Sequence, residues 1–434
     1  MDSCGGRRPE QLSKCQFGYL IEALQAGCRP KPSRSVNTVA LPPKMPLRIL
    51  YVHATFVPPP TNLQTDRFNL LSQELEGDVL QPVWFRKPEE VEAVFGPGSY
   101  PVYTVGRFRY HFFLSWRYQG IRQRLATFWF YLRKGTALYR ERRYDCIVAY
   151  SHMTTGVCAG LLKLFTGAKL IIEIVTAPQL VFLTDRPHPS LAERMWHLYS
   201  DVCLHFSMLL TDRAHFLFPR QLSMYRMLKN VKNSVFHEFI PISNIERHRE
   251  DPSADLYVLM VGSPWYLKGA DRLIEAFHRL APDFPQVKLK ILGHFPNGEK
   301  LHELIGGSPQ IEVLKATSHP EALKIISGAS ILVLPSRCEG LPRVLMEGMA
   351  AGLPLIGSDV AGIPFLIRDG ENGFVVPGGE SRGLEARLRE LLSNRDERRR
   401  MGDSGYQRAH EELSEKVYVE KFTRMVEAAV KGSE

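Results

Sequence analysis

Hydrophobic residues in the first half of the chain gather in short runs that are separated by amphipathic segments. Residues 47–52, 146–150 and 170–174 are nearly continuous apolar runs, as is typical of strands buried on both faces of a sheet. Helical patterns lie at 68–75 and at 155–165, the second between two of these runs. Strand, helix and strand in this order predict right-handed crossovers and therefore a parallel sheet.

The same alternation begins again after a polar segment, 246–255, which we interpret as a linker. Beyond it the pattern predicts strands at 256–261, 287–292, 331–334 and 354–357 and helices at 271–280, 319–326 and 342–351. A last helical pattern, 409–434, is placed to pack back on the first half. The predicted organisation is a flexible tail (1–44), a first α/β domain (45–245), the linker, a second α/β domain (256–408) and this returning helix.

Composition and charge narrow the class of protein. A chain of 434 residues is too long to fold around a single hydrophobic core. Its content of 44% hydrophobic and 23% charged residues is typical of a soluble globular protein. A net charge of +9 favours anionic partners such as phosphates or acidic lipid. Seven scattered cysteines without a Cys-x-x-Cys pair indicate a reducing compartment, and no apolar run reaches the roughly 18 residues of a membrane span. We therefore expect a cytoplasmic protein.

The first candidate site segment, 261–269, leaves a predicted strand and enters a predicted helix. Gly262 allows a tight turn and a close approach of the backbone to a ligand. Lys268 lies at the start of the helix, where free N–H groups and the helix dipole already favour an anion such as a diphosphate. The alternative is a surface loop with one solvated lysine.

The second candidate segment, 335–347, places two carboxylates after the predicted strand 331–334. Glu339 lies in the loop before a helix, and Glu347 lies in the second turn of that helix. Open α/β sheets bind ligands at the carboxyl ends of their strands, where carboxylates accept hydrogen bonds from vicinal sugar hydroxyls. The alternative for Glu347 alone is an ordinary solvated helix residue.

These segments occur in one order with further motifs. They are Gly262…Lys268-Gly269, Leu334-Pro335-Ser336, Glu339-x7-Glu347, Gly362-Ile363-Pro364 and Asp369-Gly370-Glu371-Asn372-Gly373-Phe374. Together they resemble the family-4 retaining glycosyltransferases of GT-B fold, most closely over 256–392 and more weakly over 45–244. The resemblance implies two Rossmann-like domains facing across a cleft, with the C-terminal helix packed on the first domain.

The resemblance also implies roles for individual residues. Lys268 would bind the diphosphate of a nucleotide sugar, Glu347 the ribose hydroxyls, and Glu339 the transferred sugar. Backbone N–H groups of Gly340 and Leu341 would face the sugar or phosphate. The remaining members of the implied donor site are Gly262, Ser263, Gly269, Lys315, Ala316 and Arg343. Transfer would proceed with retention at the anomeric carbon. The sequence has no Asp-x-Asp motif, so neither a metal nor another cofactor is implied, and Lys268 would neutralise the departing diphosphate.

Several positions depart from the family pattern. Ser263 stands where many relatives have arginine, and Arg343 is a candidate to supply part of the missing charge. Val175 stands where relatives often carry an active-site histidine. His152, after the predicted strand 146–150, is our candidate to replace it as a catalytic residue in the cleft; the alternative is a polar loop residue. Phe365 occupies a position often held by glutamate.

Residues 106–144 carry most of the net charge, with ten Lys and Arg against one Glu. Aromatic and basic side chains interleave there, as at membrane–water interfaces. An anionic membrane surface or a phosphate-bearing acceptor would fit this segment. The alternative is an amphipathic helix pair that packs Trp116, Phe128 and Phe130 into the first domain. Nucleic acid is not indicated, because no nucleic-acid module accompanies the charge.

Three functions remain open from the sequence. The first is a metal-independent retaining glycosyltransferase that uses a nucleotide-diphospho-sugar and a hydroxyl acceptor, which is a glycan, a lipid-linked molecule or a small molecule. The second is a sugar-nucleotide epimerase or hydrolase on the same scaffold. The third is a catalytically inactive nucleotide-sugar-binding protein, which the departures at Ser263 and Val175 favour.

Overall fold

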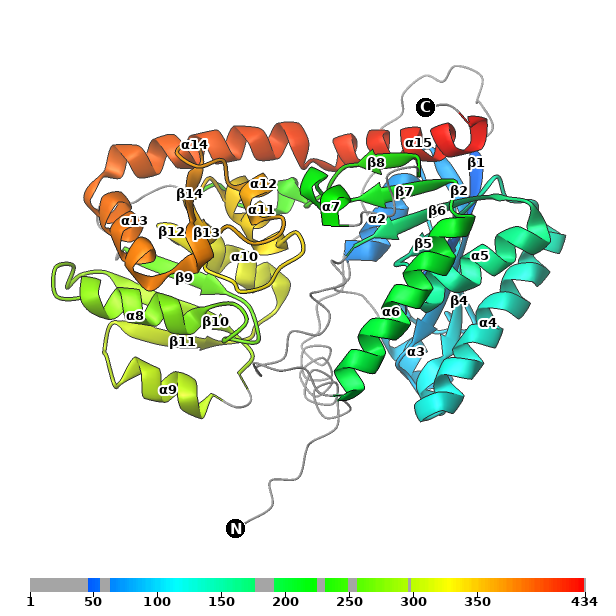
Figure 1. The fold of residues 1–434 in the computed structure, drawn as a ribbon, viewed down its shortest axis with the longest axis horizontal. Helices are drawn as coiled ribbons and strands as arrows, with labels where there is room; N and C mark the ends of the chain where they lie inside the picture. Colours follow the sequence, from blue (N-terminus) through cyan, green and yellow to red (C-terminus); the bar gives the residue numbers. More distant parts are fainter. Residues whose placement is uncertain are drawn as a thin grey trace, which may run out of the picture.

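The computed structural model describes residues 46–54, 63–175, 191–224, 231–248, 256–295 and 298–432. These residues form two separate sheets, each covered by helices on both faces (Figure 1). The predicted tail, 1–44, and residues 249–255 of the predicted linker lie outside the described residues. The two-domain α/β architecture predicted from the alternating pattern is confirmed.

The first sheet has eight strands in the order β3-β4-β2-β1-β5-β6-β7-β8. The strands are β1 (Leu47–Val52), β2 (Leu75–Val83), β3 (Val102–Val105), β4 (Phe108–Leu114), β5 (Cys146–Tyr150), β6 (Lys169–Ile174), β7 (Arg213–Phe216) and β8 (Asn233–Val235). Neighbouring strands are parallel except in the β3–β4 hairpin. The order reverses between β1 and β5, which are parallel neighbours.

The second sheet has six parallel strands in the order β11-β10-β9-β12-β13-β14. They are β9 (Tyr257–Val261), β10 (Lys288–Gly293), β11 (Ile311–Lys315), β12 (Ile331–Leu334), β13 (Leu355–Ser358) and β14 (Gly373–Val376). Each predicted strand of this half is present within one residue of its expected limits. The order reverses at the β9–β12 pair, so the loops after these two strands are neighbours.

The helices follow the predicted alternation. Around the first sheet lie α2 (Leu63–Leu71), α3 (Pro88–Phe95), η1 (Ser115–Arg117), α4 (Gly120–Glu141), α5 (Thr154–Thr166), α6 (Leu191–Leu210) and α7 (Pro219–Met224). η4 (Ile242–Asn244) joins the halves. Around the second sheet lie α8 (Ala270–Leu280), α9 (Glu299–Ile305), α10 (His319–Ser327), α11 (Arg343–Ala351), α12 (Ile363–Leu366), η5 (Pro377–Gly379), α13 (Ser381–Ser393) and α14 (Arg395–Glu412). The last helix is α15 (Glu415–Lys431).

The C-terminal helix returns to the first domain, as the resemblance implied. α14 packs on α11 of the second domain, and α15 continues across to the first, so the two helices span both halves (Figure 1). Tyr418, Phe422 and Met425 of α15 are buried in the core that also holds β1. The helix begins at Glu415 rather than at 409, because α14 extends to Glu412 before the chain turns.

Five strands of the first sheet, β2, β3, β4, β7 and β8, were missed by the sequence pattern. The predicted helix 68–75 is wrong at its end, because α2 stops at Leu71 and Leu75 already begins β2. The charge of Asp78 obscures the apolar character of β2, although this carboxylate is fully buried. It accepts hydrogen bonds from Arg109 Nε at 2.8 Å, His111 Nε2 at 2.7 Å and Tyr144 Oη at 2.6 Å. Paired in this way, a charged residue is tolerated inside a sheet.

Three buried histidines predict a stability that falls as the pH is lowered. Burial lowers the pKa of His53, His152 and His237 to about 4, while the unfolded chain binds these protons near pH 6.5. The unfolded state therefore gains protons first, and stability present above pH 6.5 is lost as the pH falls toward 4. Each histidine contributes about 1.4 kcal/mol per pH unit within this window.

Thermal unfolding between pH 7.5 and 5 measures this effect. We expect His152→Asn to flatten the pH dependence by about one third, since one of three protons is removed. The same change at the exposed His278 is the control and leaves the slope unchanged. A midpoint that does not depend on pH in this range would contradict the linkage.

Candidate functional site

The candidate donor site lies where the loops after β9 and β12 meet. These strands are parallel neighbours at the centre of the second sheet, so both chains leave the sheet at its carboxyl edge. Gly269, with φ 80°, precedes α8, and a Cβ atom there would lie 2.1 Å from the Pro335 carbonyl oxygen. Only glycine allows this approach, which brings the 262–269 loop against the 335–341 loop.

Lys268 and Glu339, 71 residues apart in the sequence, form an ion pair at this junction. The Lys268 ammonium donates to Glu339 Oε1 at 2.6 Å, and Ser336 Oγ donates to the same oxygen at 2.7 Å. The Glu339 side chain is 7% exposed and that of Lys268 is 23% exposed. A Cβ atom on Gly262 would come within 3.1 Å of Lys268 Cγ, so the glycine leaves room for the lysine stem. The structure brings together two of the three residues on which the donor-site hypothesis depends.

Glu347 lies in the second turn of α11, as expected, but it is buried rather than solvated. Its side chain is 9% exposed, and its Oε1 lies 2.9 Å from Nε2 of His319, the first residue of α10. His319 was missed from the sequence, where it is one histidine in an ordinary helix start. Lys315 ends β11 with its side chain exposed, and the half-buried Ala316 follows. The β11–α10 connection therefore carries three candidate site residues in succession, Lys315, Ala316 and His319.

Arg337 is a second residue that sequence reasoning missed. Its guanidinium donates to both carboxylate oxygens of Asp271, at 2.7 and 2.6 Å, and to the Tyr266 carbonyl at 2.5 Å. It also lies 3.9 Å from the centre of the Tyr266 ring. This bidentate ion pair fixes the first turn of α8 and the loop before it beside Glu339.

The loop after Glu339 faces the first domain. A Cβ atom on Gly340 would lie 3.6 Å from the carbonyl oxygen of Val175, the residue after β6. Leu341 belongs to a hydrophobic cluster with Phe218 of the first domain. Gly340 also accepts a hydrogen bond from the Gly362 N–H at 2.9 Å. Glu339 therefore stands next to the boundary between the domains.

Three of the predicted site residues are engaged elsewhere. The Arg343 guanidinium lies 3.6 Å from Glu238 Oε2, so its charge is directed toward the segment between the domains. Ser263 Oγ donates to the His294 carbonyl at 2.7 Å. The His152 ring is 2% exposed and lies 3.1 Å from Ser200 Oγ of α6. Because burial lowers its pKa to about 4, this imidazole is neutral at pH 7.

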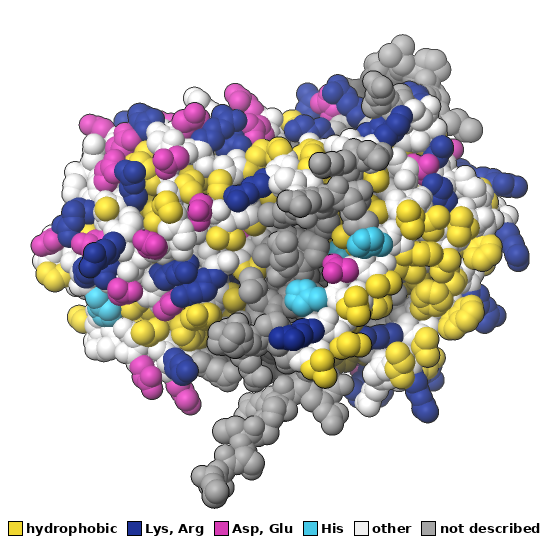
Figure 2. All heavy atoms as spheres, viewed as in Figure 1, with side chains coloured by type: hydrophobic (Ala, Val, Ile, Leu, Met, Phe, Trp, Pro, Cys, Tyr) yellow, Lys and Arg dark blue, Asp and Glu magenta, His cyan; other side chains and the backbone are white. Residues whose placement is uncertain are grey.

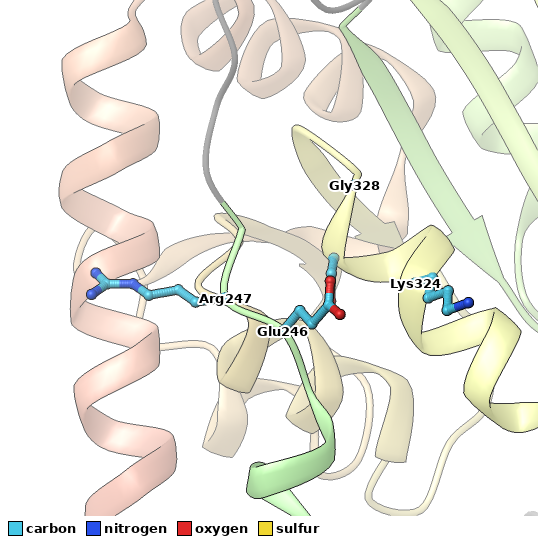
Figure 3. Close-up of a pocket in the computed structure, with 5 residues that line it drawn as sticks. Glu246, Arg247, Lys324 and Gly328 are labelled. Atoms are coloured by element: carbon cyan, nitrogen blue, oxygen red, sulfur yellow. The ribbon is translucent and has the colours of Figure 1, made fainter.

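A separate hollow of about 550 Å³ lies at the other end of α10 (Figure 3). It is wide open to solvent and is lined by Glu246, Arg247, Lys324, Ser327 and Gly328. None of the predicted donor residues borders it. We therefore place the candidate site at the Lys268–Glu339 junction rather than in this hollow. No group of three or more His, Cys, Asp or Glu side chains arranged to hold a metal occurs in the ranges that the structure describes.

Two α/β domains, each built on a largely parallel sheet with helices on both faces, have the architecture of the GT-B glycosyltransferases. Residues 242–408 match the model of the family Glycosyl transferases group 1. An uncharacterized glycosyltransferase of Methanocaldococcus jannaschii is 31% identical over 149 residues, which are 34% of this chain and 41% of that protein. The chain aligns with less than half the length of the first curated relatives.

Solved structures show the same fold over most of the chain. Sucrose-phosphate synthase from Thermosynechococcus elongatus has a TM-score of 0.71 at 15% identity, covering 89% of this chain and 100% of that chain. Anabaena HepE in complex with UDP-glucose has a TM-score of 0.61 at 15% identity and covers 89% of this chain and 100% of its own. The GT-B fold that the motifs indicated is thereby confirmed.

Proposed function

We propose that this protein is a retaining glycosyltransferase that moves a sugar from a nucleotide-diphospho-sugar to a hydroxyl acceptor. The observation that carries the proposal is the Lys268–Glu339 ion pair at the junction of β9 and β12, next to the first domain. The β11–α10 connection leaves the same carboxyl edge of the sheet, and its His319 contacts Glu347. In this proposal Lys268 binds the diphosphate, Glu339 faces the transferred sugar and Glu347 binds the ribose hydroxyls.

The ion pair indicates how donor binding would rearrange the site. Without donor, Glu339 holds the Lys268 ammonium. A diphosphate carries more negative charge than one carboxylate, so it would draw the ammonium from Glu339 Oε1. This oxygen, which still accepts from Ser336 Oγ, could then accept a second hydrogen bond from a sugar hydroxyl. Ser336 Oγ already donates to Glu339 and would keep its carboxylate in position.

The transition state builds positive charge on the sugar ring and negative charge on the departing diphosphate. In this proposal Lys268 and the amino end of α11 stabilise the departing group without a metal ion. The departing phosphate accepts the proton of the acceptor hydroxyl as that hydroxyl attacks the same face of the sugar, so retention needs no carboxylate nucleophile. His152 is not required for this chemistry, which fits its enclosed position beneath α6.

The second candidate function is a nucleotide-sugar-binding protein without transfer activity. It is favoured by Ser263 and Val175, which replace the usual arginine and histidine, and by the pairing of Arg343 with Glu238. Nothing at the Lys268–Glu339 junction favours an epimerase or hydrolase over these two.

A donor panel distinguishes the candidates. Thermal unfolding is measured with UDP-, GDP- and ADP-sugars, starting from UDP-glucose because the structural neighbour HepE binds it. A ligand at a hundred times its Kd stabilises the folded state by about 2.7 kcal/mol, which raises the midpoint by several degrees. Release of nucleoside diphosphate that depends on an acceptor supports transfer, whereas stabilisation without release supports a binding protein. No stabilisation by any nucleotide sugar would refute both.

A further inference from the structure

The exposed hydrophobic side chains are concentrated on one layer of the first domain. Twelve of the fifteen large hydrophobic side chains exposed in the described residues belong to α4, α5 and α6. They are Ile121, Leu125, Trp129, Leu164, Phe165, Leu191, Met195, Leu198, Tyr199, Val202, Phe206 and Leu209. The other three are Val102, Tyr118 and Leu304. Figure 2 shows the hydrophobic side chains gathered over the half of the molecule that carries these helices.

α6 shows most clearly that this surface has a regular pattern. Leu191, Met195, Leu198, Val202 and Leu209 recur at intervals of three, four or seven residues, which places them on one face of the helix. They are between 59% and 84% exposed. From Ser200 onward the opposite face is buried against the first domain. The helix therefore has two apolar faces, and burial in the domain accounts for only one of them.

The three helices form one continuous surface. α5 contacts α4 on one side and α6 on the other. The Arg124 guanidinium of α4 lies 4.6 Å from the centre of the Trp196 ring of α6, which joins the outer helices directly. Apolar residues from separate helices thus share one face. We call the surface formed by the twelve side chains above the apolar layer.

The charge around the apolar layer is predominantly positive. α4, α5 and α6 contain seven basic residues, Arg122, Arg124, Arg133, Lys134, Arg140, Lys163 and Arg194, and three acidic residues, Glu141, Glu193 and Asp201. The four arginines of α4 are exposed. An apolar face bordered by exposed arginines is the arrangement of helices that lie in a membrane interface.

We propose that the apolar layer of α4, α5 and α6 binds the surface of an anionic lipid membrane. Its hydrophobic side chains would enter the boundary between headgroups and acyl chains, while the arginines contact acidic headgroups. A second copy of the chain fits less well, because two such faces meeting around a two-fold axis would oppose arginine to arginine. Across the described residues, none of the helices combines the length and the apolar character that a membrane-spanning helix needs. This inference does not depend on the transfer reaction.

The test is co-sedimentation of the full chain with vesicles of phosphatidylcholine alone or with 30 mol% phosphatidylglycerol. We expect binding to the anionic vesicles that weakens as salt rises. Trp129→Ser with Leu198→Ser should lower the partition coefficient about a hundredfold, because two large exposed side chains no longer enter the lipid. Arg122→Gln with Arg133→Gln should lower it about thirtyfold on anionic vesicles only.

The matched control combines Leu304→Ser and Arg399→Gln. These residues are 41% and 82% exposed, and both belong to the second domain. The control should bind vesicles like the unaltered chain, and thermal unfolding confirms that all variants are folded.

Absence of binding at low salt would overturn the proposal. So would binding that the Trp129 and Leu198 changes leave intact, since the basic residues of 1–44 would then explain it. A dimer in sedimentation equilibrium that Leu198→Ser dissociates, without vesicle binding, would assign the surface to a second copy.

Discussion

Replacing Lys268 by alanine is expected to reduce sugar transfer about a thousandfold. Its ammonium lies 2.6 Å from Glu339 and is the cation that we assign to the departing diphosphate. Removal of one preorganised group that stabilises developing negative charge typically costs 10²–10³ in rate, and a full charge stands at the upper end. The loss should appear mainly in kcat, because the negative charge on the diphosphate increases as the bond to the sugar breaks.

Glu339→Gln separates the two members of the pair. Glutamine keeps the shape of the side chain and the acceptor oxygen for Ser336 Oγ, but it lacks the charge. We expect transfer to fall about a hundredfold, while affinity for the free nucleoside diphosphate stays unchanged or rises, because the ammonium of Lys268 is no longer held by a carboxylate. A donor-binding titration and an initial-rate assay on the same variant make this distinction.

Lys324→Ala is the matched control for Lys268→Ala. Lys324 is exposed near the far end of α10 and borders the open hollow rather than the candidate site. The Lys324→Ala substitution should leave both kcat and donor affinity unchanged. Transfer at the normal rate by Lys268→Ala would remove the basis of the proposed mechanism, whatever Glu339→Gln does.

The meeting of Lys268 and Glu339 was predictable because it follows from topology. Parallel strands joined by helices all end at one edge of a sheet, so loops after adjacent strands must meet there. The strands β9 and β12 were visible as apolar runs, and Gly262 and Gly269 marked the tight loop between β9 and α8. The pattern therefore predicted the fold of the second domain, and the resemblance implied that Lys268 and Glu339 share one site; their ion pair was not predicted.

Partners contributed by a third segment could not be predicted in the same way. His319 contacts Glu347 across the gap between two helices, and Arg337 reaches Asp271 across two loops. Neither histidine nor arginine carries a local signal that specifies its partner. Arg343 shows the same limit, because its sequence position at the start of α11 is also within reach of Glu238.

The first domain was harder to predict because buried charges interrupt its hydrophobic pattern. Asp78 lies inside β2, and Arg109 and His111 lie in β4, so both strands look polar in the sequence. Burial alone would raise the pKa of Asp78, but hydrogen bonds from His111, Arg109 and Tyr144 lower it to about 2. These residues satisfy one another only after the strands have paired, which no local window of sequence reveals.

Breaking a second buried network, between Arg67 and Glu173, is expected to destabilise the first domain by about 3–5 kcal/mol. Their side chains are 4% and 1% exposed, and Arg67 Nη2 donates to Glu173 Oε1 at 2.5 Å. Tyr51 Oη and His215 also contact this carboxylate. Burial alone would raise the pKa of Glu173, but the charge of Arg67 and these contacts lower it to about 2.

The network also connects the C-terminal helix to the first domain. The Arg67 guanidinium lies 5.4 Å from the centre of the Tyr418 ring and 5.1 Å from that of Phe422, both on α15. Glu173→Gln would leave Arg67 buried beside these rings without its counterion. Because α15 follows α14 of the second domain, the loss should loosen the connection between the domains as well as the first core.

Urea unfolding followed by tryptophan fluorescence measures the effect, with Arg67→Met, Glu173→Leu and the double variant forming a cycle. Each single variant leaves one charge buried without its partner, whereas the double variant removes both charges. We therefore expect the double variant to be more stable than either single variant. The exposed pair Glu420–Arg424, also on α15, is the control, and its removal should cost less than about 1 kcal/mol. The contribution of Glu173 is present above pH 4.5 and is lost as the pH falls toward 2. Single variants as stable as the control would show that water reaches this network and that it does not hold α15 in place.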